Sequence, residues 1–154
     1  KHWVNPILIQ EVRNALNKYQ IPPQFLKLEM TESAMVDDAK TVKNIVMALK
    51  AIGVQIALDD FGTGYSSLGY LIEFPVDILK VDRVFVVDLN AQPRRQQLMN
   101  HILSIAKSLG MRSIVEGVET KEQVDILKQF CCDQIQGYHF YKPMPVEEIE
   151  KIFI

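Results

Sequence analysis

The chain has 154 residues, 48% hydrophobic and 23% charged, a composition typical of one globular domain. Its 17 Lys and Arg residues are balanced by 19 Asp and Glu residues, which argues against a nucleic acid polymer as partner. No apolar run in the sequence is long enough to span a membrane.

Apolar periodicity predicts strands alternating with helices along the chain. Strands are expected at residues 25–30, 54–58, 78–82, 112–115 and 134–137. Helices are expected at 6–19, from Asp37 or Asp38 to 52, and at 94–109, 120–130 and beyond 146. Two apolar stripes are predicted to pack, namely Leu98, Ile102, Ile105 and Leu109, and later Ile149 and Ile152. The order of elements predicts a parallel α/β sheet.

The stretch 56–68, IALDDFGTGYSSL, places two adjacent carboxylates, Asp59 and Asp60, where the second predicted strand ends. Like charges held this close disfavour ionisation of both groups, so the pair requires compensation. One interpretation is a solvated turn, because Asp and Gly are common turn residues. The other is a divalent cation that bridges carboxylate oxygens.

Further polar side chains stand at or just beyond the other predicted strands. They are Glu29, Lys80, Asp82, Glu116 and Gln136. The carboxyl ends of parallel strands converge on one face, which holds the active site in a (β/α)8 barrel. Polar groups at the ends of all five strands therefore favour a functional site over separate solvated turns.

The residue types in this set indicate metal chemistry on phosphate. Its carboxylates offer only oxygen donors, which suit Mg²⁺ or Mn²⁺ better than zinc. They are Glu29, Asp59, Asp60 and Glu116. Four carboxylates predict a two-metal site, bridged by Asp59, for attack of water on a phosphodiester. Lys80 is expected to orient that water or to stabilise phosphate charge, with a structural ion pair to Asp82 as the alternative.

Segments in series, LDDFGTGYSSL, FPVDILKVDRVFV, VEGVET and QGYHFYKPMP, resemble the C-terminal two thirds of an EAL domain. EAL domains are cyclic-di-GMP phosphodiesterases of bacterial signalling. The resemblance therefore implies divalent-metal-dependent hydrolysis of cyclic-di-GMP to linear pGpG. It also implies a partial TIM-type (β/α)8 barrel of about five βα units, with residues 1–154 as the C-terminal part of a single EAL domain.

The resemblance implies a role for each matching residue. The metal ligands would be Glu29, Asp59, Asp60 and Glu116, and the catalytic residues Lys80, Glu116 and Asp82. The substrate contacts would be Gln136 and Glu119, and Glu32 would steady the loop after Asp60. That loop, residues 61–68, would couple homodimerisation to the site. The aromatic residues Tyr138, Phe140 and Tyr141 are expected to pack, although they have the chemistry to stack on guanine.

Some family features have no counterpart here. The Glu-Ala-Leu motif and the Asn that follows it, both metal ligands in the family, are absent. The chain does not begin with Met, and five strands cannot close an eight-stranded barrel. We therefore expect a piece of a larger protein with upstream sensory or GGDEF-type domains, located in the cytoplasm or anchored to the inner membrane. The 154 residues alone are expected to be inactive.

Three functions stay open on the sequence alone. The first is the phosphodiesterase, which the intact acidic positions favour for the complete domain. The second is a catalytically inactive EAL-type module that binds cyclic-di-GMP or a protein. The third is another metal-dependent α/β phosphatase, which differs from the first only in its nucleotide specificity.

Overall fold

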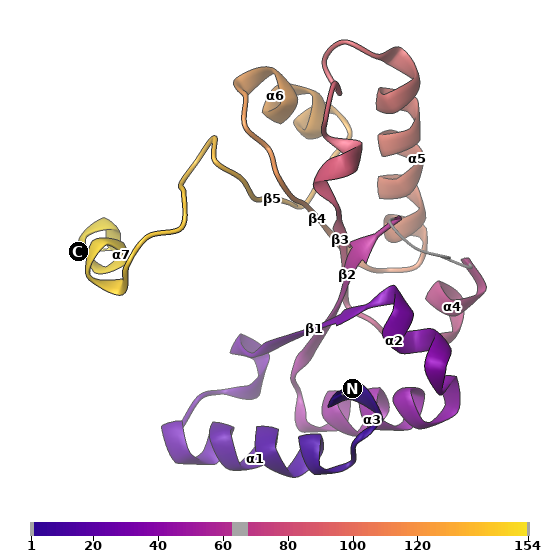
Figure 1. The fold of residues 1–154 in the computed structure, drawn as a ribbon, viewed down its shortest axis with the longest axis vertical. Coiled ribbons are helices and arrows are strands. Elements are labelled where there is room, and N and C mark those ends of the chain that lie inside the picture. Colours follow the sequence, from indigo (N-terminus) through magenta and orange to yellow (C-terminus); the bar gives the residue numbers. More distant parts are fainter. Residues whose placement is uncertain (1, 63–67, 154) are drawn as a thin grey trace.

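The computed structural model, which describes residues 2–62 and 68–153, contains a parallel sheet of five strands (Figure 1). The strands are β1 (Lys27–Thr31), β2 (Gln55–Phe61), β3 (Ile78–Val81), β4 (Arg112–Val115) and β5 (Gln134–Ile135). Each strand pairs with the next one along the chain, in the order β1-β2-β3-β4-β5. The predicted parallel α/β architecture is confirmed.

Helices precede, connect and follow the strands along the chain. They are α1 (Ile7–Tyr19), α2 (Glu32–Asp37), α3 (Ala39–Ile52), α4 (Leu68–Glu73), α5 (Pro93–Ser108), α6 (Lys121–Gln129) and α7 (Val146–Phe153). The described residues also form short 3₁₀ turns at η1 (His2–Val4), η2 (Pro23–Phe25) and η3 (Arg83–Phe85). Asp38 caps α3 by accepting a hydrogen bond from the Thr41 N–H, and Gly53 ends that helix with a φ of 101°. No helix among the described residues has the length and apolarity to cross a membrane.

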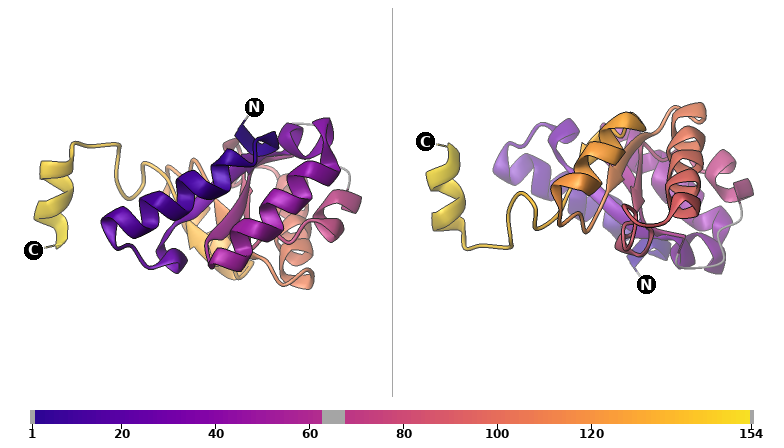
Figure 2. Two further views of the ribbon diagram at one scale, coloured as in Figure 1. Left: turned by 90° about the horizontal axis from the view of Figure 1, so that it is seen from below. Right: turned by 90° about the horizontal axis from the view of Figure 1, so that it is seen from above.

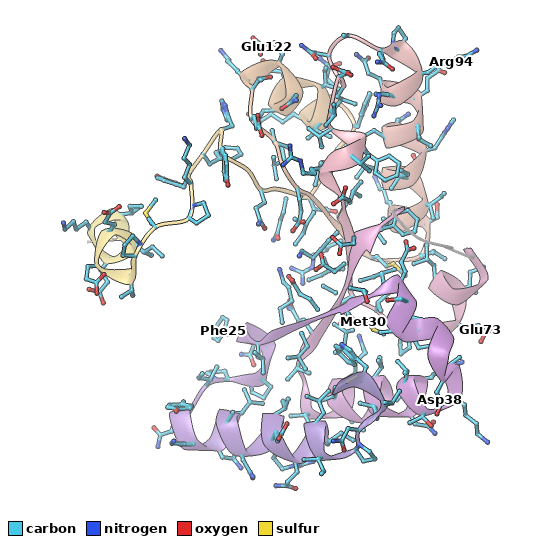
Figure 3. The ribbon with its side chains drawn as sticks, viewed as in Figure 1. Phe25, Met30, Asp38, Glu73, Arg94 and Glu122 are labelled. Carbon is cyan, nitrogen blue, oxygen red and sulfur yellow. The ribbon has the colours of Figure 1, made fainter. Side chains whose placement is uncertain are left out.

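The main core lies between the helices and one face of the sheet. Strand residues of this core alternate with residues of the other face, because successive side chains of a strand point to opposite sides. The core residues include Ile56, Leu58, Leu79, Val81 and Val115. A separate cluster of Ala57, Ile78 and Ile114 forms on the opposite face, which we call the inner face. Met30 of β1, labelled in Figure 3, belongs to the helix-covered side.

The predicted packing face of α7 was wrong, and that of α5 was correct only for Ile102, which is buried, and Ile105, which packs against the core. In α5 the buried residues are Met99, Ile102, Leu103 and Ala106. Leu98 is 48% exposed and Leu109 is 36% exposed, because α5 carries apolar residues on more than one side. In α7, Ile149 is 41% exposed and Ile152 is 42% exposed, and the helix stands away from the sheet at the end of an extended segment (Figure 2).

Candidate active site

The charged residues predicted for the site share the inner face because they follow the two-residue period of the strands. Each lies two positions after a member of the small inner-face cluster. The pairs are Ala57 and Asp59, Ile78 and Lys80, and Ile114 and Glu116. Glu29 joins them because it pairs with Ala57 in the register of β1 and β2. The inner face therefore carries an apolar layer and, toward the carboxyl ends of the strands, a charged layer.

Lys80 lies at the centre of this charged layer. Its Nζ is 2.7 Å from Asp59 Oδ1, 2.9 Å from Glu29 Oε2 and 2.9 Å from Glu116 Oε1. Burial acts to lower the pKa of Lys80, but its hydrogen bonds to the three carboxylates outweigh burial and raise that pKa above its ordinary value. Because the side chain is only 7% exposed and three carboxylates hold its ammonium group, the charge of Lys80 has a fixed position.

The structure does not support the alternative in which Lys80 pairs with Asp82. Asp82 follows β3 directly and caps η3, and its Oδ1 accepts a hydrogen bond from the Val84 N–H at 2.8 Å. This bond fixes the carboxylate of Asp82 at the start of the loop after β3.

A β-bulge brings Asp60 to the same rim. Between the pairs Leu58–Leu79 and Phe61–Val81, β2 advances by three residues while β3 advances by two. Asp60 takes the left-handed conformation, with a φ of 54°. In a regular strand adjacent side chains point to opposite faces, so the extra residue is what allows both aspartates to approach one cluster. The predicted strand end at residue 58 was wrong, because β2 continues through this bulge to Phe61.

The electrostatics of Asp60 indicate excess negative charge in the cluster. Burial raises the pKa of Asp60, and the nearby carboxylates of Asp59 and Asp82 raise it further, against the opposing effect of Lys80. Lys80 alone therefore does not offset the negative charge that is gathered here. A divalent cation at this rim would lower the repulsion.

The donor set fits Mg²⁺ or Mn²⁺ by its chemistry, although in the part of the chain that the structure describes its carboxylates are not arranged around a common ion position. Hard oxygen donors from β1, β2 and the end of β4 gather at one rim, as such ions require. Within residues 2–62 and 68–153, however, no three acidic, His or Cys side chains are arranged to hold an ion. The ammonium of Lys80 lies between the carboxylates instead. The two-metal arrangement stays a prediction.

A pocket of about 200 Å³, which we call the loop pocket, adjoins the charged layer. Its lining residues are Asp82, Arg83, Glu116, Gly117, Glu119, Gln136, Gly137 and Tyr138. The pocket thus brings together the predicted substrate contacts Glu119 and Gln136, and Glu116 connects it to Lys80. Tyr138 is 57% exposed, so the expectation that this ring packs was wrong. Phe140 and Tyr141 are likewise exposed.

Backbone contacts join the loops that form this pocket. The Val118 N–H donates to the Gln136 carbonyl at 3.1 Å, and the Val118 carbonyl accepts from the His139 N–H at 3.0 Å. A Cβ on Gly137 would lie 2.0 Å from the Val118 oxygen, so a side chain cannot fit between these two loops. These contacts therefore fix the position of the loop after β4 relative to the loop after β5.

Glu32 contacts the beginning of the loop after Asp60. Its Oε1 accepts a hydrogen bond from the Gly62 N–H at 2.7 Å, which is the contact that a loop-steadying residue needs. Residues 63–67 of that loop lie outside the described residues. The steadying role of Glu32 and the coupling of the loop to a dimer stay predictions.

Two residues of the site region were missed from the sequence. Arg83 lines the loop pocket, and Gln123, which forms a capping box with Thr120 at the start of α6, also reaches the loop after β3. The position of Arg83 directly after Asp82 was an available signal. For Gln123 the sequence carries no signal beyond the cap.

Comparison with known proteins gives matches over almost the whole chain. The family model of the EAL domain matches residues 1–143. The cyclic di-GMP phosphodiesterase NbdA of Pseudomonas aeruginosa is 40% identical over 144 residues, which are 94% of this chain and 18% of NbdA. This chain thus spans less than a fifth of that relative.

Solved structures agree with this match. The P. aeruginosa MucR phosphodiesterase in complex with c-di-GMP has a TM-score of 0.86 and 39% identity, over 92% of this chain and 57% of that chain. A manganese and c-di-GMP complex of Klebsiella pneumoniae BlrP1 has a TM-score of 0.81 and 28% identity, over 87% of this chain and 34% of that one.

Proposed function

Because this chain belongs to the EAL domain family, we propose that the protein containing it hydrolyses cyclic-di-GMP to linear pGpG. The observation that carries the proposal is the contact of Lys80 with the carboxylates of Glu29 in β1, Asp59 in β2 and Glu116 just after β4, beside the loop pocket. The names of NbdA and MucR as phosphodiesterases support it.

The carboxylates of the charged layer would hold Mg²⁺ or Mn²⁺, in line with the manganese complex of BlrP1. They are Glu29, Asp59, Asp60 and Glu116. A metal held there would polarise a phosphate oxygen and lower the pKa of a bound water. Lys80 would supply a fixed positive charge that orients the attacking water or stabilises charge developing on phosphate oxygens. The carboxylate of Asp82, held by the Val84 N–H, would accept a hydrogen bond from a group bound in the loop pocket.

The loop pocket would receive one guanine base. A carboxylate such as that of Glu119 can accept both hydrogen bonds from the N1–H and N2–H groups of guanine. The ring of Tyr138 offers a stacking surface, and the Gln136 amide offers both a donor and an acceptor. The scissile phosphate would then lie toward Glu116 and Lys80.

A turnover assay on the complete protein tests this function. We expect pGpG to be released with Mn²⁺ or Mg²⁺ and no release after chelation. Glu119→Gln should raise KM for cyclic-di-GMP about tenfold, because one lost charge-assisted hydrogen bond weakens binding by that order. The exposed Glu122 of α6, labelled in Figure 3, provides a matched control, and Glu122→Gln should leave KM unchanged. Tight binding of cyclic-di-GMP without cleavage would instead establish a receptor.

We further propose that the protein forms a homodimer across the face beside the loop after Asp60. A groove of about 410 Å³ lies there, lined by Gly62, Val84, Phe85, Arg94, Arg95 and Leu98. Val84 is 46% exposed and Leu98 is 48% exposed, which leaves apolar surface for a second copy.

A charge placed in this groove should separate the copies. We expect Leu98→Glu to lower the molar mass measured by light scattering from that of a dimer to that of a monomer. Met47 of α3, which is 54% exposed, supplies the control, and Met47→Glu should leave the mass unchanged. A monomeric wild-type protein would refute the proposal.

A further inference from the structure

Gln123, in the first turn of α6, uses both ends of its side-chain amide. Its Oε1 accepts hydrogen bonds from the Glu119 N–H at 2.8 Å and the Thr120 N–H at 3.1 Å. Its Nε2 donates to the Val86 carbonyl at 3.2 Å. The oxygen therefore holds the loop after β4, while the nitrogen holds the loop after β3.

The loop after β3 begins at Asp82 and reaches the buried residue Val86 further along. Asp82 caps η3, and the Val86 N–H donates to the Arg83 carbonyl at 2.9 Å. Val86 itself is 1% exposed. A bond to the Val86 carbonyl thus restrains a short segment that begins at a predicted catalytic carboxylate.

The loop after β4 approaches the same segment at a second point. Gly117 has a φ of 70°, and a Cβ on it would lie 2.4 Å from the Cβ of Arg83. The two loops therefore pack without room for a side chain between them, and both line the loop pocket. The sheet fixes where both loops begin, since the Glu116 N–H donates to the Val81 carbonyl at 3.0 Å, and the contacts beyond that point restrain the rest of each loop.

We infer that Gln123 is a positioning residue that holds the Asp82 loop against the Glu116–Glu119 loop. A capping box needs only an acceptor at the Gln123 position, and glutamate serves there as well as glutamine. Only the amide also supplies a donor to the Val86 carbonyl. A glutamine at position 123 therefore suits a link between the two loops, whereas the helix cap alone requires only an acceptor.

This inference rests on the proposed function, because the consequence of the link is the placement of Asp82 and Glu116 for hydrolysis. Small displacements of catalytic groups strongly reduce the rate of the chemical step. Substitution of a residue that orients the groups around a metal typically lowers activity by about 10–100-fold. Substrate affinity should depend less on the bond to Val86, since the Glu119 N–H is held by Gln123 Oε1 and the Gln136 carbonyl accepts from the Val118 N–H.

The test uses Gln123→Glu in the complete protein. The carboxylate keeps the cap and the bonds from Glu119 and Thr120, but places an oxygen against the Val86 carbonyl. We expect kcat for cyclic-di-GMP to fall about tenfold, with KM within twofold of wild type and a smaller fall in melting temperature than in a variant that also loses the helix cap. Hydrogen exchange should accelerate in residues 83–89 and stay at the wild-type rate in residues 116–120.

Two further variants complete the experiment. Gln123→Met loses both functions of the amide, so exchange should accelerate in both segments and the melting temperature should fall by a few degrees. Gln129→Glu makes the same chemical change at an exposed position of α6 and should resemble wild type.

The inference is overturned if Gln123→Glu has wild-type kcat and wild-type exchange in residues 83–89, because Gln123 is then only a cap. A uniform acceleration of exchange across the protein would overturn it as well. If the wild-type protein does not cleave cyclic-di-GMP, the proposed function fails, and the exchange pattern alone decides whether Gln123 links the loops.

Discussion

Replacing Lys80 with methionine is expected to lower turnover of cyclic-di-GMP by about 10²–10³-fold, the usual effect of removing one fixed electrostatic group from a site. Methionine is one atom shorter than lysine but keeps its unbranched apolar stem, so the inner face stays largely filled. The change leaves three carboxylates facing one another without their shared cation. We expect the fold to be retained but the free energy of unfolding in metal-free buffer to fall by about 1.5–3 kcal/mol.

Added Mn²⁺ should stabilise Lys80→Met more than it stabilises the wild type, because a bound cation offsets the repulsion that lysine otherwise offsets. Thermal unfolding with and without Mn²⁺ measures this difference. A Lys80→Met enzyme with turnover within threefold of wild type would remove Lys80 from the mechanism.

Lys50 offers a matched control at the other end of the sheet. It forms an ion pair with Asp77, just before β3, and its side chain is 31% exposed. Lys50→Met should also lower the unfolding free energy, but leave turnover per folded molecule unchanged at a permissive temperature. A parallel loss of turnover in both variants would mean that the effect of Lys80 is on stability alone.

Much of the charged layer could be predicted because it follows the regular period of the strands. The sequence spaces an apolar residue and a charged one two positions apart in β2, β3 and just past the end of β4. Parallel strands then place these pairs side by side without further information. The convergence of Asp59, Lys80 and Glu116 could therefore be predicted from this alternation and from the order of the elements alone.

The parts that could not be predicted depend on departures from that period or on tertiary contacts. The bulge at Asp60 requires a φ of 54°, and the sequence shows only that Asp tolerates it. Gln123 has the same local signature whether or not its Nε2 reaches Val86. The buried face of α5 was predicted only in part because apolar residues occur on several sides of the helix, so periodicity alone does not identify the side that meets the sheet.

Asp59→Asn is the second substitution with a large expected effect, because Asp59 is the predicted bridge between two metals. Asparagine keeps the size of the side chain and removes its charge. Lys80 keeps its contacts with Glu29 and Glu116, so the variant should fold. A ligand shared by two ions affects both of them. We therefore expect Asp59→Asn to lower Mn²⁺ affinity at least tenfold and to reduce the bound stoichiometry below that of wild type, with turnover falling by about 10³-fold.

Comparing Asp60→Asn with Asp59→Asn distinguishes a ligand that bridges two metal ions from a neighbouring ligand of one ion. Asn tolerates the left-handed conformation at this position, so the bulge should persist. Isothermal titration calorimetry with Mn²⁺ on the complete domain compares the two variants. A bridging Asp59 predicts that Asp59→Asn weakens both binding events, whereas Asp60→Asn weakens one. The exposed Asp125 of α6 provides the control, since Asp125→Asn should bind Mn²⁺ as wild type does. Equal Mn²⁺ affinity in wild type and Asp59→Asn would contradict the bridge, because a shared ligand cannot lose its charge without weakening at least one of the ions it joins.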